Sequence, residues 1–74
     1  MLRIRDLRED KDLSQARIAV VLNCTQQTYS RYENGERSIP IESLIRLAYF
    51  YNVSLDYIVG ITNIKNCFRR NDYK

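Results

Sequence analysis

The sequence contains no histidine, and it has only two cysteines, two glycines and one proline among its 74 residues. The lack of histidine excludes Ser-His-Asp and Cys-His nucleophilic pairs as well as HExxH zinc sites. The two cysteines, Cys24 and Cys67, are too few for a disulfide framework or a four-thiolate zinc site, so we expect both to be reduced thiols. Since a glycine-rich phosphate loop is also missing, we expect no enzymatic activity, no metal and no cofactor.

Long apolar runs are missing as well. The longest two, residues 18–22 and 47–51, are far shorter than the ~20 residues that a membrane-spanning helix needs. The first residues carry mixed charges in place of an apolar segment and a small-residue cleavage site, so we see no signal peptide. We therefore expect a cytoplasmic protein with no membrane partner. A chain of 74 residues has room for one small domain.

The formal net charge is +3 at pH 7, and its location is more informative than its size. Residues 1–60 carry eight basic and eight acidic side chains, so the whole excess lies in residues 61–74. The bulk charge is therefore only a weak indication of a nucleic-acid partner. An argument for DNA has to come from where particular side chains lie.

Apolar residues at helical spacing predict a first helix of about three turns between Leu2 and Lys11. Ser14 is a good N-cap and predicts a second helix over residues 15–22. Asparagine is the residue other than glycine that best tolerates the left-handed backbone conformation. We therefore expect Asn23 to end the second helix in a tight turn.

The same rules predict three more helices. Thr25 caps a third helix that runs from residue 26 to about residue 33, where Asn34-Gly35 stops it. Pro40 suits the first turn of a fourth helix, and Ser54 caps a fifth. No stretch alternates in the manner of a β-strand, so the sequence predicts an all-α domain.

Residues 14–34 form the segment that points to a function. Two capped helices joined by three residues form a rigid helix-turn-helix unit, and such units place their second helix in the DNA major groove. At the start of that helix, Gln26 and Gln27 can each make paired hydrogen bonds to adenine, and the Thr28 methyl can pack on thymine. The capping Thr25 and the helix-start N–H groups can face a phosphate.

Several strings in the chain resemble one family. The sequence has Leu13-Ser14-Gln15 before the second helix, Ser30-Arg31-Tyr32-Glu33-Asn34-Gly35 at the end of the third, and Asn52-Val53-Ser54-Leu55-Asp56 further on. This combination is similar to the Cro/C1-type (XRE) helix-turn-helix family of phage and bacterial repressors, over about residues 3–60. The resemblance implies a five-helix, lambda-repressor-like DNA-binding domain in residues 1–60, with double-stranded DNA as the partner. Residues 61–74, which hold the excess of positive charge, are then a short basic tail.

The resemblance also implies roles for individual residues. Gln15 matches a phosphate-binding position that supports the recognition helix, and Asn34 and Arg37, on the loop that follows, match further backbone-contacting positions. Arg8 and Glu33 match a pair that forms an internal ion pair between the first helix and the end of the recognition helix. The positions that read or touch bases match Gln26, Gln27, Thr28, Ser30 and Arg31.

Two residues depart from the family pattern. Glu36 occupies a loop position that is often lysine, and a carboxylate near phosphate should weaken binding. Arg17 replaces a more usual acidic residue and can compensate as a phosphate contact. Plainer interpretations also stay open: the glutamines can be solvated helix-start residues, and Arg31 can pair with Glu33 or Glu36 at the surface, a contact worth only ~0.2–1 kcal/mol.

Tyr49, Phe50 and Tyr57 stand where the family more often has polar or small side chains. They can enlarge the core of a small domain. Alternatively, they can form a surface for self-association or a protein partner, because aromatic residues are enriched in interfaces. Ile61 and Ile64 have helix-like spacing, so the tail either docks on this surface or takes part in a dimer contact. Both interpretations stay open.

The expected function is sequence-specific transcriptional regulation, as a repressor that acts by occupying its operator. A homodimer, at least on DNA, would place two recognition helices ~34 Å apart on a near-palindromic site. Two rivals remain. One is an antitoxin-like module that binds DNA and a toxin protein, and the other is a protein-interaction domain on the same scaffold, which the neutral charge of residues 1–60 favours.

Overall fold

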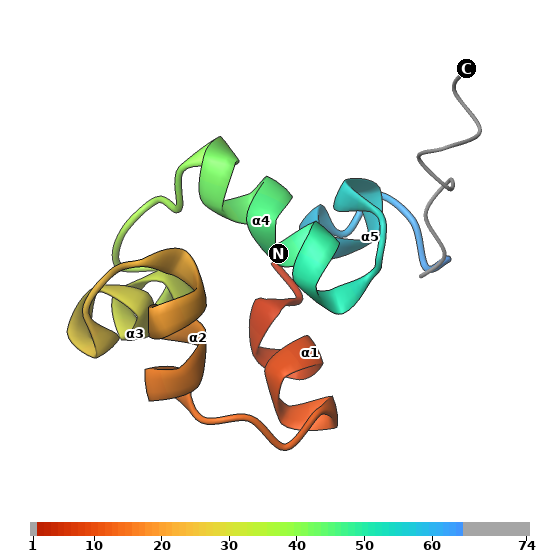
Figure 1. The fold of residues 1–74 in the computed structure, drawn as a ribbon. Helices are drawn as coiled ribbons and strands as arrows, with labels where there is room; N and C mark the ends of the chain where they lie inside the picture. Colours follow the sequence, from red (N-terminus) through yellow and green to blue (C-terminus); the bar gives the residue numbers. More distant parts are fainter. Residues whose placement is uncertain (1, 65–74) are drawn as a thin grey trace.

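Five helices make up the part of the chain that the structure, a computed structural model, describes, which is residues 2–64. They are α1 (Ile4–Asp10), α2 (Gln15–Leu22), α3 (Gln26–Asn34), α4 (Ile41–Tyr51) and α5 (Leu55–Val59). Figure 1 shows α2 packed on α3 at one end of the domain and α4 packed on α5 at the other. No strand occurs in residues 2–64, so the predicted all-α, lambda-repressor-like class is confirmed. Cys67 and the tail beyond residue 64 lie outside the described residues.

Side-chain caps determine where three of the helices begin. The Ser14 hydroxyl accepts a hydrogen bond from the Arg17 N–H at 3.1 Å, and the Thr25 hydroxyl accepts one from the Thr28 N–H at 3.0 Å. The Ser54 hydroxyl caps α5 in the same way. Each bond satisfies a helix-start N–H group that has no partner within its own helix. The predicted starts of α2, α3 and α5 are therefore confirmed.

The first helix is shorter than the sequence predicted. α1 has seven residues, which is about two turns and not three. Asp12 adopts the left-handed conformation (φ 58°) and its N–H donates to the Glu9 carbonyl at 3.0 Å, while the Leu13 N–H donates to the Arg8 carbonyl at 3.0 Å. This reversal uses the last carbonyls of α1 and ends it without glycine or proline. Asn23, also at φ 58°, ends α2 as predicted.

The core takes apolar side chains from every helix. The most deeply buried residue of each helix is at most 1% exposed: Ile4, Ile18, Tyr29, Leu47 and Ile58. Cys24 packs against this core as a partly buried side chain. α3 contributes only Tyr29 and Tyr32 to the buried set, so most of its surface is available for other contacts.

Arg3 fastens the segment after α5 to the N-terminal segment. Its Nε donates to the Tyr57 carbonyl at 2.8 Å, and its Nη2 donates to Asn63 Oδ1 at 2.7 Å. The guanidinium carbon lies 4.5 Å from the centre of the Tyr57 ring, a cation–π contact. Tyr57 is only 9% exposed beneath this contact. Its predicted place on an exposed dimer or partner surface is therefore wrong.

The other members of that predicted surface are exposed apolar side chains. The exposed fractions are 58% for Tyr49, 40% for Phe50, 75% for Ile61 and 66% for Ile64. Their part in a dimer or partner contact stays a prediction. None of the helices within residues 2–64 combines the length and the apolar composition required to cross a bilayer.

Candidate nucleic-acid interface

The outer face of α3 carries the residues predicted to read bases. Because Tyr29, Tyr32 and the side chain of Glu33 are the buried part of α3, the other side chains of the helix reach the surface. Gln26, Gln27 and Arg31 are exposed, and Thr28 and Ser30 are half-buried. The two glutamines follow directly after the Thr25 cap, at the end of the helix where a helix-turn-helix unit contacts base edges.

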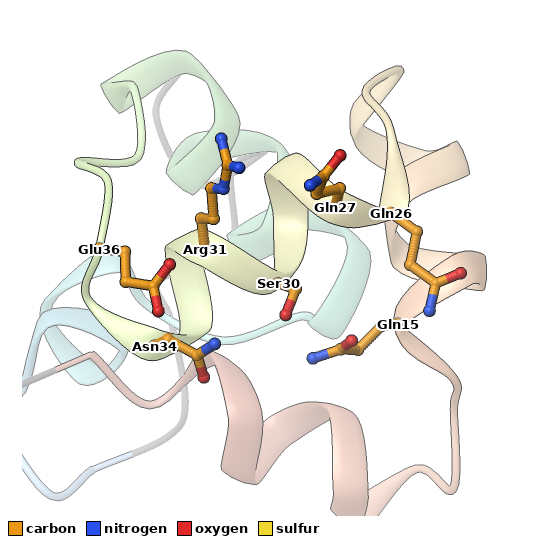
Figure 2. Close-up of a pocket in the computed structure, with 7 residues that line it drawn as sticks. All are labelled: Gln15, Gln26, Gln27, Ser30, Arg31, Asn34 and Glu36. Atoms are coloured by element: carbon orange, nitrogen blue, oxygen red, sulfur yellow. The ribbon is translucent and has the colours of Figure 1, made fainter.

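An open groove runs along this face of α3, and Figure 2 shows the side chains that line it. It brings together four of the five predicted base-reading residues with two predicted phosphate-binding residues, Gln15 and Asn34, which lie 19 positions apart in the chain. Glu36 adds a carboxylate to the same groove. The full lining is Gln15, Gln26, Gln27, Ser30, Arg31, Asn34 and Glu36.

The remaining predicted contacts lie outside this lining. Thr28 Oγ1 accepts a hydrogen bond from the Thr25 hydroxyl at 2.9 Å, so both side chains are already engaged in the cap of α3. Arg17, in the first turn of α2, and Arg37, in the loop after α3, are exposed. Within residues 2–64, Arg31 makes no ion pair with Glu33 or Glu36, which removes the plainer interpretation of Arg31 given above.

A buried ion pair lies beneath the groove. Arg8 Nε donates to Glu33 Oε2 at 2.7 Å and Arg8 Nη2 donates to Glu33 Oε1 at 3.2 Å. The Glu33 side chain has no exposed area, and that of Arg8 is 14% exposed. Arg8 Nη1 also donates to the Leu13 carbonyl at 2.9 Å. The expected link between the first helix and the end of the recognition helix is thus present, and it extends to the segment before α2.

The surroundings of Glu33 keep its carboxylate ionised. Burial by itself raises the pKa of this carboxyl, but the hydrogen bonds from Arg8, and then the influence of Tyr29 and Gln15, outweigh burial and lower the pKa to about 2. The Tyr29 hydroxyl lies near this carboxylate without the geometry of a hydrogen bond. Burial and the Glu33 charge raise the pKa of Tyr29, so this hydroxyl stays protonated.

Glu33 also positions side chains that line the groove. Gln15 Nε2 donates to Glu33 Oε1 at 3.1 Å, which supports α3 from the first turn of α2. Arg5, which the sequence reasoning did not single out, donates from Nε to Glu33 Oε1 at 3.4 Å and from Nη2 to Asn34 Oδ1 at 2.9 Å. Asn34 was expected on the loop after the recognition helix, but it is the last residue of α3. The available signal for Arg5 was its spacing of three from Arg8, which places both on one face of α1.

Acidic and thiol side chains form no metal site in this part of the molecule. Among residues 2–64, no group of three or more histidine, cysteine, aspartate or glutamate side chains is arranged to hold a metal ion. Cys24 is partly buried, and burial raises the pKa of its thiol. The groove itself is lined by amide, hydroxyl and guanidinium groups together with the Glu36 carboxylate.

Comparison with known proteins gives a family match over most of the chain. The sequence profile of the family described as Helix-turn-helix matches residues 4–58. The chain is 34% identical over 61 residues to the uncharacterized HTH-type transcriptional regulator YobD of Bacillus subtilis (strain 168), covering 82% of this chain and 54% of that protein. It is 39% identical over 58 residues to the cryptic phage CTXphi transcriptional repressor RstR of Vibrio cholerae, covering 78% of this chain and 52% of that protein.

A third relative is named as an antitoxin. The chain is 35% identical over 63 residues to antitoxin PezA of Streptococcus pneumoniae serotype 4, covering 85% of this chain and 40% of that protein. The chain thus spans about half the length, or less, of these curated relatives. No solved structure matches the chain at a comparable significance.

Proposed function

Because this chain belongs to the helix-turn-helix family, in its XRE type, we propose that it is a sequence-specific DNA-binding transcriptional regulator that represses by occupying its operator. The observation that carries the proposal is the groove along α3, whose lining the exposed glutamines at the helix start share with Gln15 and Asn34. Such a face offers donors and acceptors to base edges and donors to the flanking phosphates. Repression agrees with the name of the phage relative RstR.

In this proposal α3 enters the major groove. Gln26 and Gln27 hydrogen-bond adenines through their amide groups, because an amide presents a donor and an acceptor at the spacing of adenine N7 and N6. Thr28, Ser30 and Arg31 make the other base contacts. Exposure of the two glutamines and of Arg31 supports these assignments, since a side chain reaches a base edge only from the surface.

The phosphate contacts lie at both ends of the unit. Gln15 and Arg17 bind phosphate from the first turn of α2, and Thr25 does so from the turn, where the free N–H groups at the start of α3 point the same way. Asn34 and Arg37 bind phosphate from the end of α3 and the loop after it. Such contacts fix how the protein sits on the duplex, and they carry no sequence information of their own.

The domain that binds DNA is residues 1–60 in this proposal, with residues 61–74 as a tail. We assign the protein no enzymatic activity or cofactor, and we place it in the cytoplasm, where its DNA partner is found. A homodimer on DNA would present two copies of α3 to successive major grooves, ~34 Å apart, on a near-palindromic operator. Two half-sites supply the specificity that a single short helix lacks.

Binding-site selection from random duplex DNA, followed by the mass of the purified complex, tests the proposal. Enrichment of one near-palindromic sequence, with two chains on each duplex, is the expected result. If no sequence is enriched over the starting pool, DNA recognition is refuted, and the protein-interaction alternative takes its place.

A second candidate is an antitoxin-like module, which the similarity to PezA and the exposed Tyr49 and Phe50 favour. Such a protein would bind DNA through α3 and a toxin protein through its aromatic residues. Expression together with the neighbouring gene, followed by purification of the complex, distinguishes it from a free-standing repressor. A stable complex whose formation Tyr49→Ala and Phe50→Ala abolish would support the antitoxin candidate. Separate elution of the two proteins would contradict it.

A further inference from the structure

Arg5 contacts Asn34, which lines the α3 groove, but no DNA contact has been assigned to it so far. Its Nη2 donates to Asn34 Oδ1 at 2.9 Å, across 29 residues of sequence. Its Nε lies 3.4 Å from Glu33 Oε1. Half of the Arg5 side chain is exposed to solvent. The guanidinium therefore reaches the last residue of α3 from α1 and still faces water.

The neighbouring carboxylate of Glu33 does not neutralise the positive charge of Arg5. Arg8 holds Glu33 with two hydrogen bonds, one of them at 2.7 Å, and Gln15 donates a third at 3.1 Å. The bond from Arg5 to Glu33 is the longest of the set. A second carboxylate, that of Glu9, lies 3.9 Å from Arg8. Its side chain is 62% exposed, so water strongly screens its charge. Arg5 thus remains a solvent-facing cation with unused N–H donors.

The contact with Arg5 also determines which end of the Asn34 amide can bind a ligand. A guanidinium only donates hydrogen bonds, so the amide atom that it contacts has to be the oxygen. The Asn34 NH₂ group is then left to donate elsewhere, and the Asn34 side chain lines the groove (Figure 2). A phosphate oxygen accepts hydrogen bonds and never donates one. This orientation therefore suits a phosphate, whereas the flipped amide would repel it.

We propose that Arg5 and Asn34 together form a clamp for one backbone phosphate of the DNA, with Arg5 both orienting the Asn34 amide and binding the phosphate itself. This extends the interface from the α2–α3 unit to α1, and it rests on the proposed DNA-binding function. Arg5 supplies a charge-assisted donor and Asn34 a neutral one, on two elements that Glu33 already ties together. The clamp carries no base specificity, because every nucleotide presents the same phosphate.

Single methylphosphonate substitutions along the selected site test the clamp, because each removes the charge of one phosphate. Binding of the wild-type protein should weaken about fivefold to tenfold at the clamped position in each half-site, in addition to the positions that the other proposed phosphate contacts bind. Arg5→Ala should weaken binding to the unmodified site to a similar degree, lose sensitivity at that position only, and lower the slope of log affinity against log salt by about 0.9. Lys11→Ala, which removes an exposed charge at the end of the same helix, should keep the wild-type methylphosphonate profile.

Arg5→Lys separates charge from orientation. It keeps the cation but lacks the planar fork, so it should retain the salt slope and bind less tightly than wild type. Thermal unfolding of each variant shows that binding is measured on folded protein. If Arg5→Ala keeps the full methylphosphonate profile and the full salt slope, the clamp is refuted while the DNA-binding function stands. If the wild-type protein selects no site, the proposed function itself fails.

Discussion

The Arg8 guanidinium and the Glu33 carboxylate form a two-bond ion pair, 2.7 Å from Nε to Oε2 and 3.2 Å from Nη2 to Oε1, that joins α1 to the end of α3. Gln15 and Arg5 donate to the same carboxylate, and Arg5 continues to Asn34. One buried carboxylate thus organises side chains from three helices under the groove. Stability and the geometry of the candidate interface depend on the same group.

Arg8→Ala should therefore destabilise the domain by about 3–5 kcal/mol, because it leaves the Glu33 carboxylate buried without its main partner. Urea denaturation measures this loss. Glu9→Ala is the matched control, since it removes the other carboxylate near Arg8, which is 3.9 Å away and 62% exposed. The control should change the free energy of unfolding by less than about 1 kcal/mol. Equal effects of the two substitutions would show that the Arg8–Glu33 pair contributes little.

Lowering the pH should reduce the free energy of unfolding, because it protonates Glu33. Its pKa is lowered from an ordinary 4.5 to about 2, because the bonds from Arg8 and its other partners outweigh burial. Above the ordinary value both the folded and the unfolded states are ionised, and the full contribution is present. As the pH falls from 4.5 toward 2 the unfolded state takes up the proton first, so up to about 3 kcal/mol of stability is lost. Urea midpoints measured between pH 2 and 7 test this window.

Glu33→Gln provides the control for the acid window, because glutamine has no proton to gain. The variant should be less stable than wild type at pH 7, and its stability should fall less steeply with acid between pH 4.5 and 2. If the stability of Glu33→Gln fell with acid as steeply as that of wild type, other carboxyl groups, and not Glu33, would govern acid unfolding.

The features that followed from the sequence are mostly local ones. Ser14, Thr25 and Asn23 predicted the bounds of α2 and the start of α3, because a cap acts within three or four residues of itself. α1 is shorter than predicted mainly because it begins at Ile4 and not near Leu2, whereas its end at Asp10 is within one residue of the predicted Lys11. Pro40 is the extended residue before α4 and not its first helical residue. Both errors concern a backbone conformation for which the residue type is only a weak guide.

Long-range contacts explain what the sequence could not reveal. The sequence left open whether Tyr57 belongs to the core or to an exposed surface, and the contact with Arg3, 54 residues away, places it under cover. The Arg8–Glu33 pair was accessible only through the family resemblance, and the contact of Arg5 with Asn34 was not predicted at all. Spacing along α1 places Arg5 and Arg8 on one face, yet what that face meets depends on how α1 crosses α3.

Gln27→Ala should reduce affinity for the selected operator by about 1–3 kcal/mol and leave binding to random DNA almost unchanged, because it removes a base contact. Arg37→Ala is the contrasting variant. It removes a phosphate contact, so it should weaken binding to both kinds of DNA alike and flatten the salt dependence. Titrations of each variant with operator and random duplexes at several salt concentrations separate the two patterns. A similar loss by Gln27→Ala on both duplexes would contradict base reading.

Glu36 places a carboxylate in the groove among the proposed DNA contacts (Figure 2). Its charge is repelled by the phosphate backbone, so Glu36→Lys should raise affinity for operator and random DNA alike, by about tenfold, and steepen the salt slope by about 0.9. Glu36→Gln removes the repulsion without adding a cation and should give a smaller gain at an unchanged slope. The same titrations measure both variants.

The specific and non-specific affinities of Glu36→Lys decide between two roles for this carboxylate. If Glu36 only repels phosphate, the ratio of the two affinities stays as in wild type, because every sequence carries the same backbone. If Glu36 instead accepts a hydrogen bond from the amino group of a cytosine, the substitution leaves that base without its partner. Operator binding by Glu36→Lys then falls about tenfold relative to random DNA, whereas Glu36→Gln, whose amide oxygen can still accept that hydrogen bond, falls less. A changed ratio would therefore contradict the purely repulsive role and add Glu36 to the base-reading set.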